Sequence, residues 1–271
     1  MRPWMGQSFN SKAVRTLGSV IRHPSLAVPH LALTNIAQLD FAALKAMGIR
    51  GIIFDKDNTL TAPYVEELHP AISDGFRRCQ SHFGGSVCIM SNSAGTGDDV
   101  NFESAIKIET GLGIPVLRHR EKKPGGLPEV LAFFRERCAD EGIEARDLCV
   151  IGDRLLTDVV FGNLHGMLTV HTKPLTLQGD NKVALVARYI ESRIFFNIVH
   201  ARFSVEAPQH RLSGSLQQLV LQNGDAQEQA SENERQSLLQ TGAASDQHSQ
   251  QDKIPAEEKI TSSAKQEKKL Q

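Results

Sequence analysis

Short apolar runs alternate with longer amphipathic stretches through the middle of the chain. The runs are continuously apolar, as in strands that are buried on both faces. Between the third and fourth runs, residues 126–142 place apolar side chains at helical spacing, and Gly142 is expected to end this helix. The pattern predicts an α/β fold with a parallel sheet that helices cover on both faces. The strand-like runs are IRGIIFD, SVCIMS, IPVLR, DLCVIGD and GMLTVHT.

The two ends of the chain differ in composition from this middle. Residues 1–39 contain basic and hydroxyl side chains but no Asp or Glu, which is typical of organelle transit peptides. The alternative is a basic amphipathic segment that lies on the domain or on a membrane. Everything after Phe203 lacks aromatic residues and is rich in Gln, Ser, Glu and Lys, so we expect it to be disordered. We therefore predict a targeting or amphipathic segment at 1–45, a folded domain at 46–204 and a disordered polar tail at 205–271.

Charge and cysteine usage exclude several classes of protein. The formal net charge is -1 and the pI is near 6.8, so the chain lacks the basic field of nucleic-acid-binding proteins and we expect no nucleic-acid partner. No apolar stretch reaches the roughly 18 to 20 residues that a bilayer span needs, so we expect no transmembrane segment. The 4 cysteines form no CxxC pair and predict neither a zinc site nor a disulfide framework.

Polar residues follow four of the predicted strands, at the sheet edge where parallel α/β folds bind ligands. Each has an ordinary explanation on its own, as a helix cap, a turn residue or part of a solvated loop. Together, and in this order, they favour a single catalytic site. The residues are Asp55, Asp57 and Thr59 after the first strand, Ser91 and Asn92 after the second, Lys122 and Lys123 beyond the third, and Asp153 and Asp158 after the fourth.

The segments FDKDNTL, IMSNS, KKPG and VIGDRLLTD resemble, in this order, the motifs of the haloacid dehalogenase (HAD) superfamily of phosphatases. The resemblance covers about residues 46–175. It implies a Rossmann-like fold, an aspartyl-phosphate intermediate and one Mg²⁺ ion as cofactor.

This resemblance assigns the chemical steps to three residues. Asp55 would be the nucleophile, since a carboxylate can attack phosphorus in line. Asp57 lies on the same side of an extended chain, with Lys56 pointing away, and would protonate the leaving alkoxide and then activate water. Lys123 would neutralise charge on the phosphate and on Asp55. It is preferred to Lys122 because the superfamily's lysine commonly precedes a proline.

The other motif residues would bind phosphate and metal. Thr59 would brace the first loop, and Ser91 and Asn92 would lie at the phosphate, with Ser91 donating a hydrogen bond to it. The implied metal ligands are hard oxygen donors, which Mg²⁺ prefers. They are Asp55, the backbone carbonyl of Asp57, Asp153 and Asp158, of which Asp158 would support the metal or orient the lysine.

The spacing of the motifs leaves no room for the cap domain that encloses small substrates in many members of the superfamily. Asp57 and Ser91 are 34 positions apart, and Asn92 and Lys123 are 31 positions apart. One helix and one strand would largely fill each interval. The site should therefore be open, which suits a phosphate carried by a protein, a polymer or a membrane lipid.

A longer match narrows the substrate. The segments HPSLAVPHL, FDKDNT, TGLGIPVLRHREKKPG and VIGDRLLTDVVFGNLHG resemble the mitochondrial phosphatidylglycerophosphatase family, whose members remove the terminal phosphate from phosphatidylglycerophosphate on the route to cardiolipin. The resemblance implies peripheral attachment to an anionic membrane surface, on the matrix side of the mitochondrial inner membrane, with plastid or cytoplasm as alternatives. Two other functions stay open: a HAD phosphatase of soluble phosphomonoesters or phosphoproteins, and a non-catalytic binding protein of the same fold.

Two further groups of residues have two interpretations each. The apolar residues of 24–33 and 183–200 would contact a membrane or pack on the domain. Several basic residues would face the doubly anionic headgroup, or would belong to a solvated loop. The basic residues are Arg118, His119, Arg120, Lys122 and Arg154.

Overall fold

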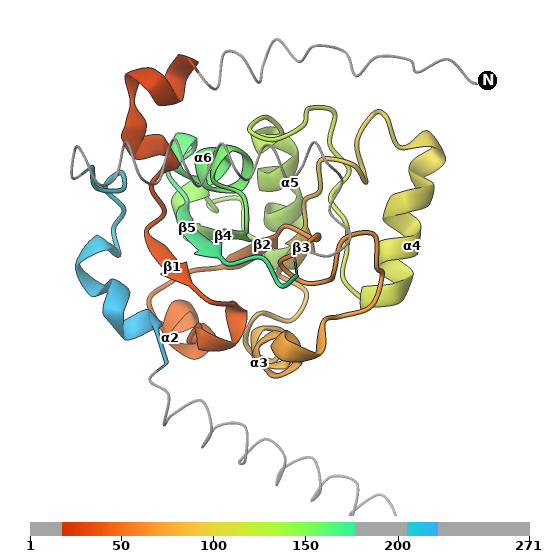
Figure 1. The fold of residues 1–271 in the computed structure, drawn as a ribbon, viewed down its shortest axis with the longest axis horizontal. Helices are drawn as coiled ribbons and strands as arrows, with labels where there is room; N and C mark the ends of the chain where they lie inside the picture. Colours follow the sequence, from red (N-terminus) through yellow and green to blue (C-terminus); the bar gives the residue numbers. More distant parts are fainter. Residues whose placement is uncertain (1–17, 177–204, 222–271) are drawn as a thin grey trace, which may run out of the picture. The chain divides into compact units, whose positions relative to one another are not determined.

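The strands form one parallel sheet in the order β1-β5-β4-β2-β3. The structure is a computed structural model that describes residues 18–176 and 205–221 (Figure 1). It confirms the predicted α/β, Rossmann-like fold. The strands are β1 (Leu31–Leu33), β2 (Gly51–Phe54), β3 (Val87–Ile89), β4 (Leu148–Gly152) and β5 (Leu168–Thr172).

Helices cover both faces of this sheet, as the apolar runs predicted. The helices α2 and α3 lie on one face, and α5 and α6 lie on the other (Figure 1). Short 3-10 turns and one π turn complete the connections. The helices are α2 (Phe41–Ala46), α3 (Ser73–Phe83), α4 (Glu103–Leu112), α5 (Leu127–Cys138) and α6 (Val160–Leu164).

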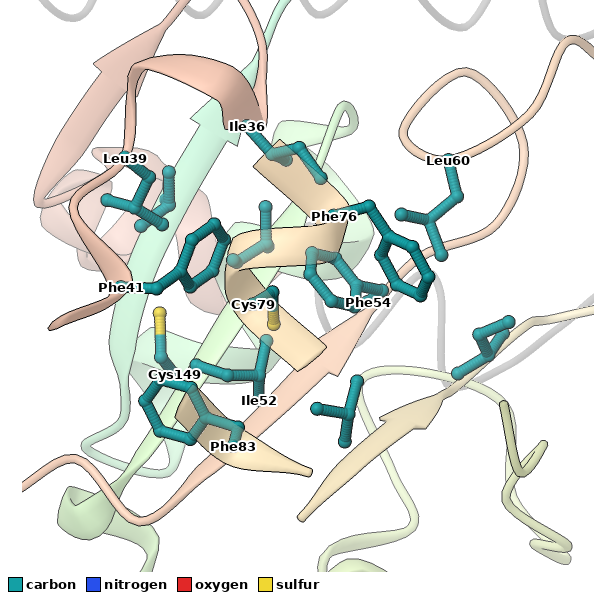
Figure 2. Packing of buried hydrophobic residues seen from close by; sticks show 14 of the residues in the cluster. Ile36, Leu39, Phe41, Ile52, Phe54, Leu60, Phe76, Cys79, Phe83 and Cys149 are labelled. Carbon is teal, nitrogen blue, oxygen red and sulfur yellow. The ribbon is translucent and has the colours of Figure 1, made fainter. Parts of the chain in front are cut away.

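The alternation of side chains along β2 divides the core into two clusters. Ile52 and Phe54 point to the face of α2 and α3, where Phe76 packs edge-on against Phe54 (Figure 2). Ile53 points to the opposite face, where it packs in a cluster with Phe134 of α5. Because both faces of the strand are dry, the sequence reads as a continuous apolar run. The free cysteines, which lie in or against these two apolar clusters, are Cys79, Cys88, Cys138 and Cys149.

The predicted helix at residues 126–142 is α5, but it ends earlier than expected. Ala139 takes a left-handed conformation and its N–H bonds back to the last turn. Gly142 lies beyond this end, and its N–H donates to Asp140 Oδ1 at 2.7 Å.

The third predicted strand, residues 114–118, does not become a full strand. It makes a single parallel bridge to β3, in which Leu117 N donates to Ile89 O at 2.8 Å. Pro115 has no N–H to donate, which limits the ladder. The fifth strand of the sheet is instead β1, from the segment that we assigned to the N-terminal extension.

The folded domain therefore begins well before residue 46. Leu33 of β1 is buried, and so are Phe41 and Leu44 of α2. Asn163 holds the turn that precedes β1, because its Nδ2 donates to Leu26 O at 2.9 Å and to Val28 O at 2.8 Å. The residues of 24–33 thus pack on the domain, which was one of their two predicted interpretations.

A short C-terminal segment also packs on the domain, in contrast to the disorder expected from residue 205. Leu212, Leu219 and Leu221 are buried. Leu219 O accepts the N–H of Asp40 at 2.9 Å, and Leu221 N donates to Gln38 O at 2.9 Å. Burial of these three leucines contributes apolar stabilisation to this part of a polar sequence. Residues 1–17, the apolar residues of 183–200 and the rest of the tail lie outside the described residues.

Within residues 18–176 and 205–221, no helix is long and apolar enough to cross a membrane.

Two truncations will test the revised boundary. A chain that begins at residue 46 lacks β1 and the buried side chains of Leu33, Phe41 and Leu44. Each such side chain stabilises by about 1.5 to 3 kcal/mol against a total of about 5 to 15 kcal/mol, so we expect no cooperative unfolding transition in urea. A chain that begins at residue 18 keeps these contacts and should unfold cooperatively. An unchanged urea midpoint in the shorter chain would contradict the revised boundary.

Candidate active site

The carboxyl ends of β2, β3 and β4 meet at one edge of the sheet. Phe54 of β2 pairs with Ile89 of β3 and with Ile151 of β4. The residues that follow these strands therefore leave the sheet at the same level. Asp55 is still held there, because its N–H donates to Ile151 O at 2.9 Å, and Asp153 follows β4 directly.

Three carboxylates converge at this edge. One oxygen from each of Asp55, Asp153 and Asp158 lies within 4.8 Å of the others. Asp153 and Asp158 are buried, and Asp55 is partly exposed. Clustered carboxylates repel one another unless cations balance them, and their hard oxygen atoms suit divalent ions. This cluster could hold a metal ion.

Lys123 lies among these carboxylates. Its Nζ donates to Asp55 Oδ1 at 2.7 Å and to Asp158 Oδ1, and its side chain is 2% exposed. Burial lowers the pKa of Lys123, but the carboxylates of Asp158 and Asp55 raise it by more, so this pKa stands above its ordinary value and the group is a cation. Lys122 points elsewhere and pairs with Asp98 at 2.7 Å on the surface. The structure thus places Lys123 among the carboxylates and Lys122 on the surface, whereas the sequence only favoured Lys123.

Asp158 is brought to the lysine by a close approach of two chain segments. It lies in the π turn Leu155–Val159, which packs against the end of β4. A Cβ atom on Gly152 would come within 2.4 Å of Asp158 Oδ2, so only glycine leaves room there. The N–H of Arg154 donates to the same oxygen at 3.2 Å. Asp158 Oδ1 therefore accepts a hydrogen bond from Lys123 Nζ directly.

Asp57 has a different partner from Asp55. Its Oδ1 lies 2.6 Å from Lys56 Nζ and accepts the N–H of Tyr64 at 3.2 Å. The expectation that Lys56 points away was wrong, because the chain is extended only as far as Asp55 and then turns tightly. In that turn Lys56 O accepts the N–H of Leu60 at 3.0 Å.

The Lys56 side chain is enclosed by the loop that follows. It is 7% exposed, and its Nζ also donates to Thr61 Oγ1 at 3.2 Å and to Val65 O at 3.0 Å. The loop thereby fixes the ammonium group, and the ammonium group holds the Asp57 carboxylate in turn. Sequence reasoning missed this pairing, for which the only signal was the lysine between the two aspartates.

Asn58, which sequence reasoning did not single out, braces the first loop. Its backbone takes the left-handed conformation with φ of 64°, and its side chain accepts the N–H of Thr176 at 3.1 Å. Thr59, the residue expected in this role, is buried beside it, and its Oγ1 has no hydrogen-bond partner in the described part of the chain. The signal for Asn58 was its tolerance of left-handed backbone.

Ser91 and Asn92 lie in the turn after β3. Ser91 is buried, and its hydroxyl oxygen accepts the N–H of Ser93 at 3.2 Å. Asn92 Oδ1 accepts the N–H of Lys123 at 2.8 Å. Asn92 therefore links the turn to the loop that carries the lysine.

The three arginines assigned to the headgroup have distinct surroundings. Arg118 forms a two-pronged ion pair with Glu109, with distances of 2.6 and 2.9 Å, which holds the pKa of Glu109 below its usual value. Arg120 is exposed, whereas Arg154 is partly buried and its Nε has no hydrogen-bond partner among the described residues. Arg154 lies near enough to Asp158 for its positive charge to favour the ionised carboxylate.

Comparison with known proteins agrees with this arrangement. A family model described as mitochondrial PGP phosphatase matches residues 11–176. The chain belongs to this family. The match includes the N-terminal segment that the structure places in the domain.

Several curated relatives fall in the same group. The chain is 44% identical over 210 residues to a chloroplastic phosphatidylglycerophosphate phosphatase 1 of Chlamydomonas reinhardtii, covering 76% of this chain and 75% of the relative. It is 37% identical over 190 residues to a chloroplastic/mitochondrial one of Arabidopsis thaliana, covering 69% and 53%. A mitochondrial phosphatidylglycerophosphatase of Saccharomyces cerevisiae is 31% identical over 148 residues, covering 54% and 78%. No solved structure matches the chain.

Proposed function

We propose that this phosphatase hydrolyses phosphatidylglycerophosphate to phosphatidylglycerol and inorganic phosphate, a step toward cardiolipin. Family membership and the names of the curated relatives support this substrate. The observation that carries the chemistry is the buried Lys123 between Asp55 and Asp158, with Asp153 beside them.

Asp55 and Asp57 divide the reaction between them. An Asp55 oxygen attacks phosphorus and the bond from phosphorus to the glycerol oxygen breaks. Asp57 enters this step protonated on the carboxyl oxygen that does not face Lys56, and it gives that proton to the glycerol oxygen. Water then attacks the aspartyl-phosphate while Asp57 takes a proton from it, and the bond from phosphorus to the Asp55 oxygen breaks to release phosphate. Lys123 balances the charge on phosphate and Asp55, and Ser91 and Asn92 lie at the phosphoryl oxygens.

The carboxylate cluster fits a magnesium ion. Three carboxylates share one lysine ammonium, which leaves negative charge for a divalent cation to balance. Asp55 and Asp153 would be direct ligands together with the backbone carbonyl of Asp57, and Asp158, already bonded to Lys123, would support the metal. Bound there, the ion reduces the repulsion between the phosphate and these acids and polarises the phosphoryl oxygens.

The connections around the site favour a substrate that is carried by something large. Between Asp57 and Ser91 the chain forms a loop, the helix α3 and β3, and between Asn92 and Lys123 it forms α4 and a short extended run. No further domain is inserted in these described residues. An open site of this kind would reach a headgroup on an anionic membrane surface, with the protein attached peripherally.

A mitochondrial location is proposed from the family and the yeast relative, on the matrix side of the inner membrane, with the plastid as the alternative suggested by the algal and plant relatives. The full chain with a C-terminal fluorescent protein should co-purify with mitochondrial inner membranes and resist added protease until the inner membrane is opened. A purely cytosolic signal would contradict this location.

The substrate will be tested with purified protein, Mg²⁺ and phosphatidylglycerophosphate in mixed micelles, beside soluble phosphomonoesters. We expect kcat/KM to favour the lipid by about 10² or more, since a polar headgroup site discriminates strongly. Asp55→Asn should abolish phosphate release while the chain still unfolds cooperatively in urea, at a lower midpoint because Lys123 loses one of its two carboxylate partners. Turnover of the soluble esters alone would instead support a soluble phosphatase, and no turnover of either would support a binding protein.

Lys56→Met will test the pairing that holds Asp57. We expect kcat for the lipid to fall roughly 10- to 100-fold with little change in KM, because a proton-transfer group that is misplaced loses catalysis but not substrate binding. The control is Lys107→Met, since Lys107 is an exposed lysine of α4. Equal kcat in both variants would show that the ion pair has no part in positioning Asp57.

A further inference from the structure

His119 is a buried histidine whose two ring nitrogens both face backbone carbonyl oxygens. Nδ1 lies 2.6 Å from Glu121 O, and Nε2 lies 2.9 Å from Ser91 O. The residue is 3% exposed, so water does not replace either contact. A carbonyl oxygen accepts hydrogen bonds and donates none, and a neutral imidazole carries only one N–H. Both contacts are satisfied only when both ring nitrogens carry a proton.

His30 in the same domain shows how a neutral buried histidine is surrounded. Its Nε2 donates to Pro208 O at 2.9 Å, whereas its Nδ1 accepts the N–H of Thr169 at 3.1 Å and lies 2.7 Å from the hydroxyl of the same residue, which can also donate to it. One nitrogen faces an acceptor and the other faces a donor, which suits the neutral ring. Burial accordingly lowers the pKa of His30 to about 4. His119 has acceptors on both sides, so the same reasoning leads to the opposite charge.

The contacts of His119 join the two loops that meet at the site. Ser91 lies in the turn after β3, and Glu121 lies two residues before Lys123. The backbone repeats this connection, because His119 N donates to Gly95 O at 2.8 Å and Lys123 N donates to Asn92 Oδ1 at 2.8 Å. The imidazole ring therefore connects the turn that carries Ser91 to the loop that carries Lys123.

Two basic side chains near His119 in the sequence are paired with acidic side chains of their own. Arg118 is paired with Glu109, and Lys122 is paired with Asp98. The carbonyl dipoles of Ser91 and Glu121 thus stabilise a charge on His119. Ser91 is next in sequence to Asn92, whose side chain accepts the N–H of Lys123.

We propose that His119 is an imidazolium that fixes the Ser91 turn to the Lys123 loop and adds a positive charge beside the phosphate position. It is a positioning residue, since it reaches substrate only through Ser91 and Lys123. This role rests on the proposed phosphatase function and differs from the direct headgroup contact that the sequence suggested for His119. A phosphate dianion that enters among three carboxylates gains from every fixed cation nearby.

Nitrogen NMR of the full chain will test the charge without any turnover. Two-bond ¹H–¹⁵N correlations of the magnesium-loaded protein with inorganic phosphate, near neutral pH, distinguish an imidazolium from either neutral tautomer. His119→Gln identifies the resonances. We expect both ring nitrogens of His119 to be protonated while those of His30 show the neutral Nε2–H form. An unprotonated nitrogen in His119 would overturn the proposal.

Competitive inhibition by inorganic phosphate will test the consequence. His119→Gln keeps an amide donor but removes the charge, and we expect phosphate to bind about tenfold more weakly, because a fixed positive charge near the phosphate position is lost. The matched control is His165→Gln, because His165 meets the same loop through one nitrogen only, at 3.1 Å from Pro124 O, and burial lowers its pKa. His165→Gln should bind phosphate within about twofold of the unmodified chain.

The two proposals fail in different ways. If His119→Gln and His165→Gln bind phosphate equally well, the role of His119 is overturned whatever lipid the enzyme hydrolyses. If the unmodified chain does not hydrolyse phosphatidylglycerophosphate but His119 is protonated and its variant loses phosphate affinity, the substrate assignment fails and the role of His119 stands. If His119→Gln does not fold, His119→Asn takes its place in both measurements.

Discussion

The buried ammonium group of Lys123 is the interaction on which the carboxyl edge of the sheet depends. Its Nζ is 2.7 Å from Asp55 Oδ1 and also contacts Asp158 Oδ1, with almost no solvent access. A charge removed from water is tolerated only when opposite charges and hydrogen bonds compensate it. The lysine and the two carboxylates therefore require one another, and loss of one partner would leave a buried charge at a cost of about 3 to 5 kcal/mol.

The surrounding backbone is built to hold this group in place. Gly152 lets Asp158 approach the end of β4, and Asn92 receives the N–H of Lys123 itself. The ring of His119 also joins these two loops, through contacts to Ser91 O and Glu121 O. A phosphate bound between Ser91 and Lys123 would thus meet two loops that are linked at several points, which keeps the reacting groups in one geometry.

The two aspartates of the first motif differ in their partners, and this difference separates their roles. Asp55 pairs with Lys123 inside the cluster, where its charge is balanced and it lies beside Asp153 and Asp158. Asp57 pairs with Lys56, outside the cluster and under the control of the loop that follows. Two carboxylates only two positions apart are in this way given different electrostatic surroundings, as the proposed nucleophile and the proposed acid-base group would require.

The sequence by itself determined the layers of the fold, the order of the motifs and the sheet edge where they meet. The layers follow from local apolar periodicity, and the edge follows because the carboxyl ends of parallel strands lie on the same side of a sheet. Only the tertiary structure placed β1 at the edge of the sheet and packed residues 205–221 on the domain, because both depend on contacts between segments far apart in the chain. The same holds for the side-chain partners. Lys56 turns back to Asp57 because a tight loop encloses it, and Arg118 is paired with Glu109 because a helix brings that acid within reach. Local sequence records which residues can ionise, whereas the fold decides which opposite charge each one meets.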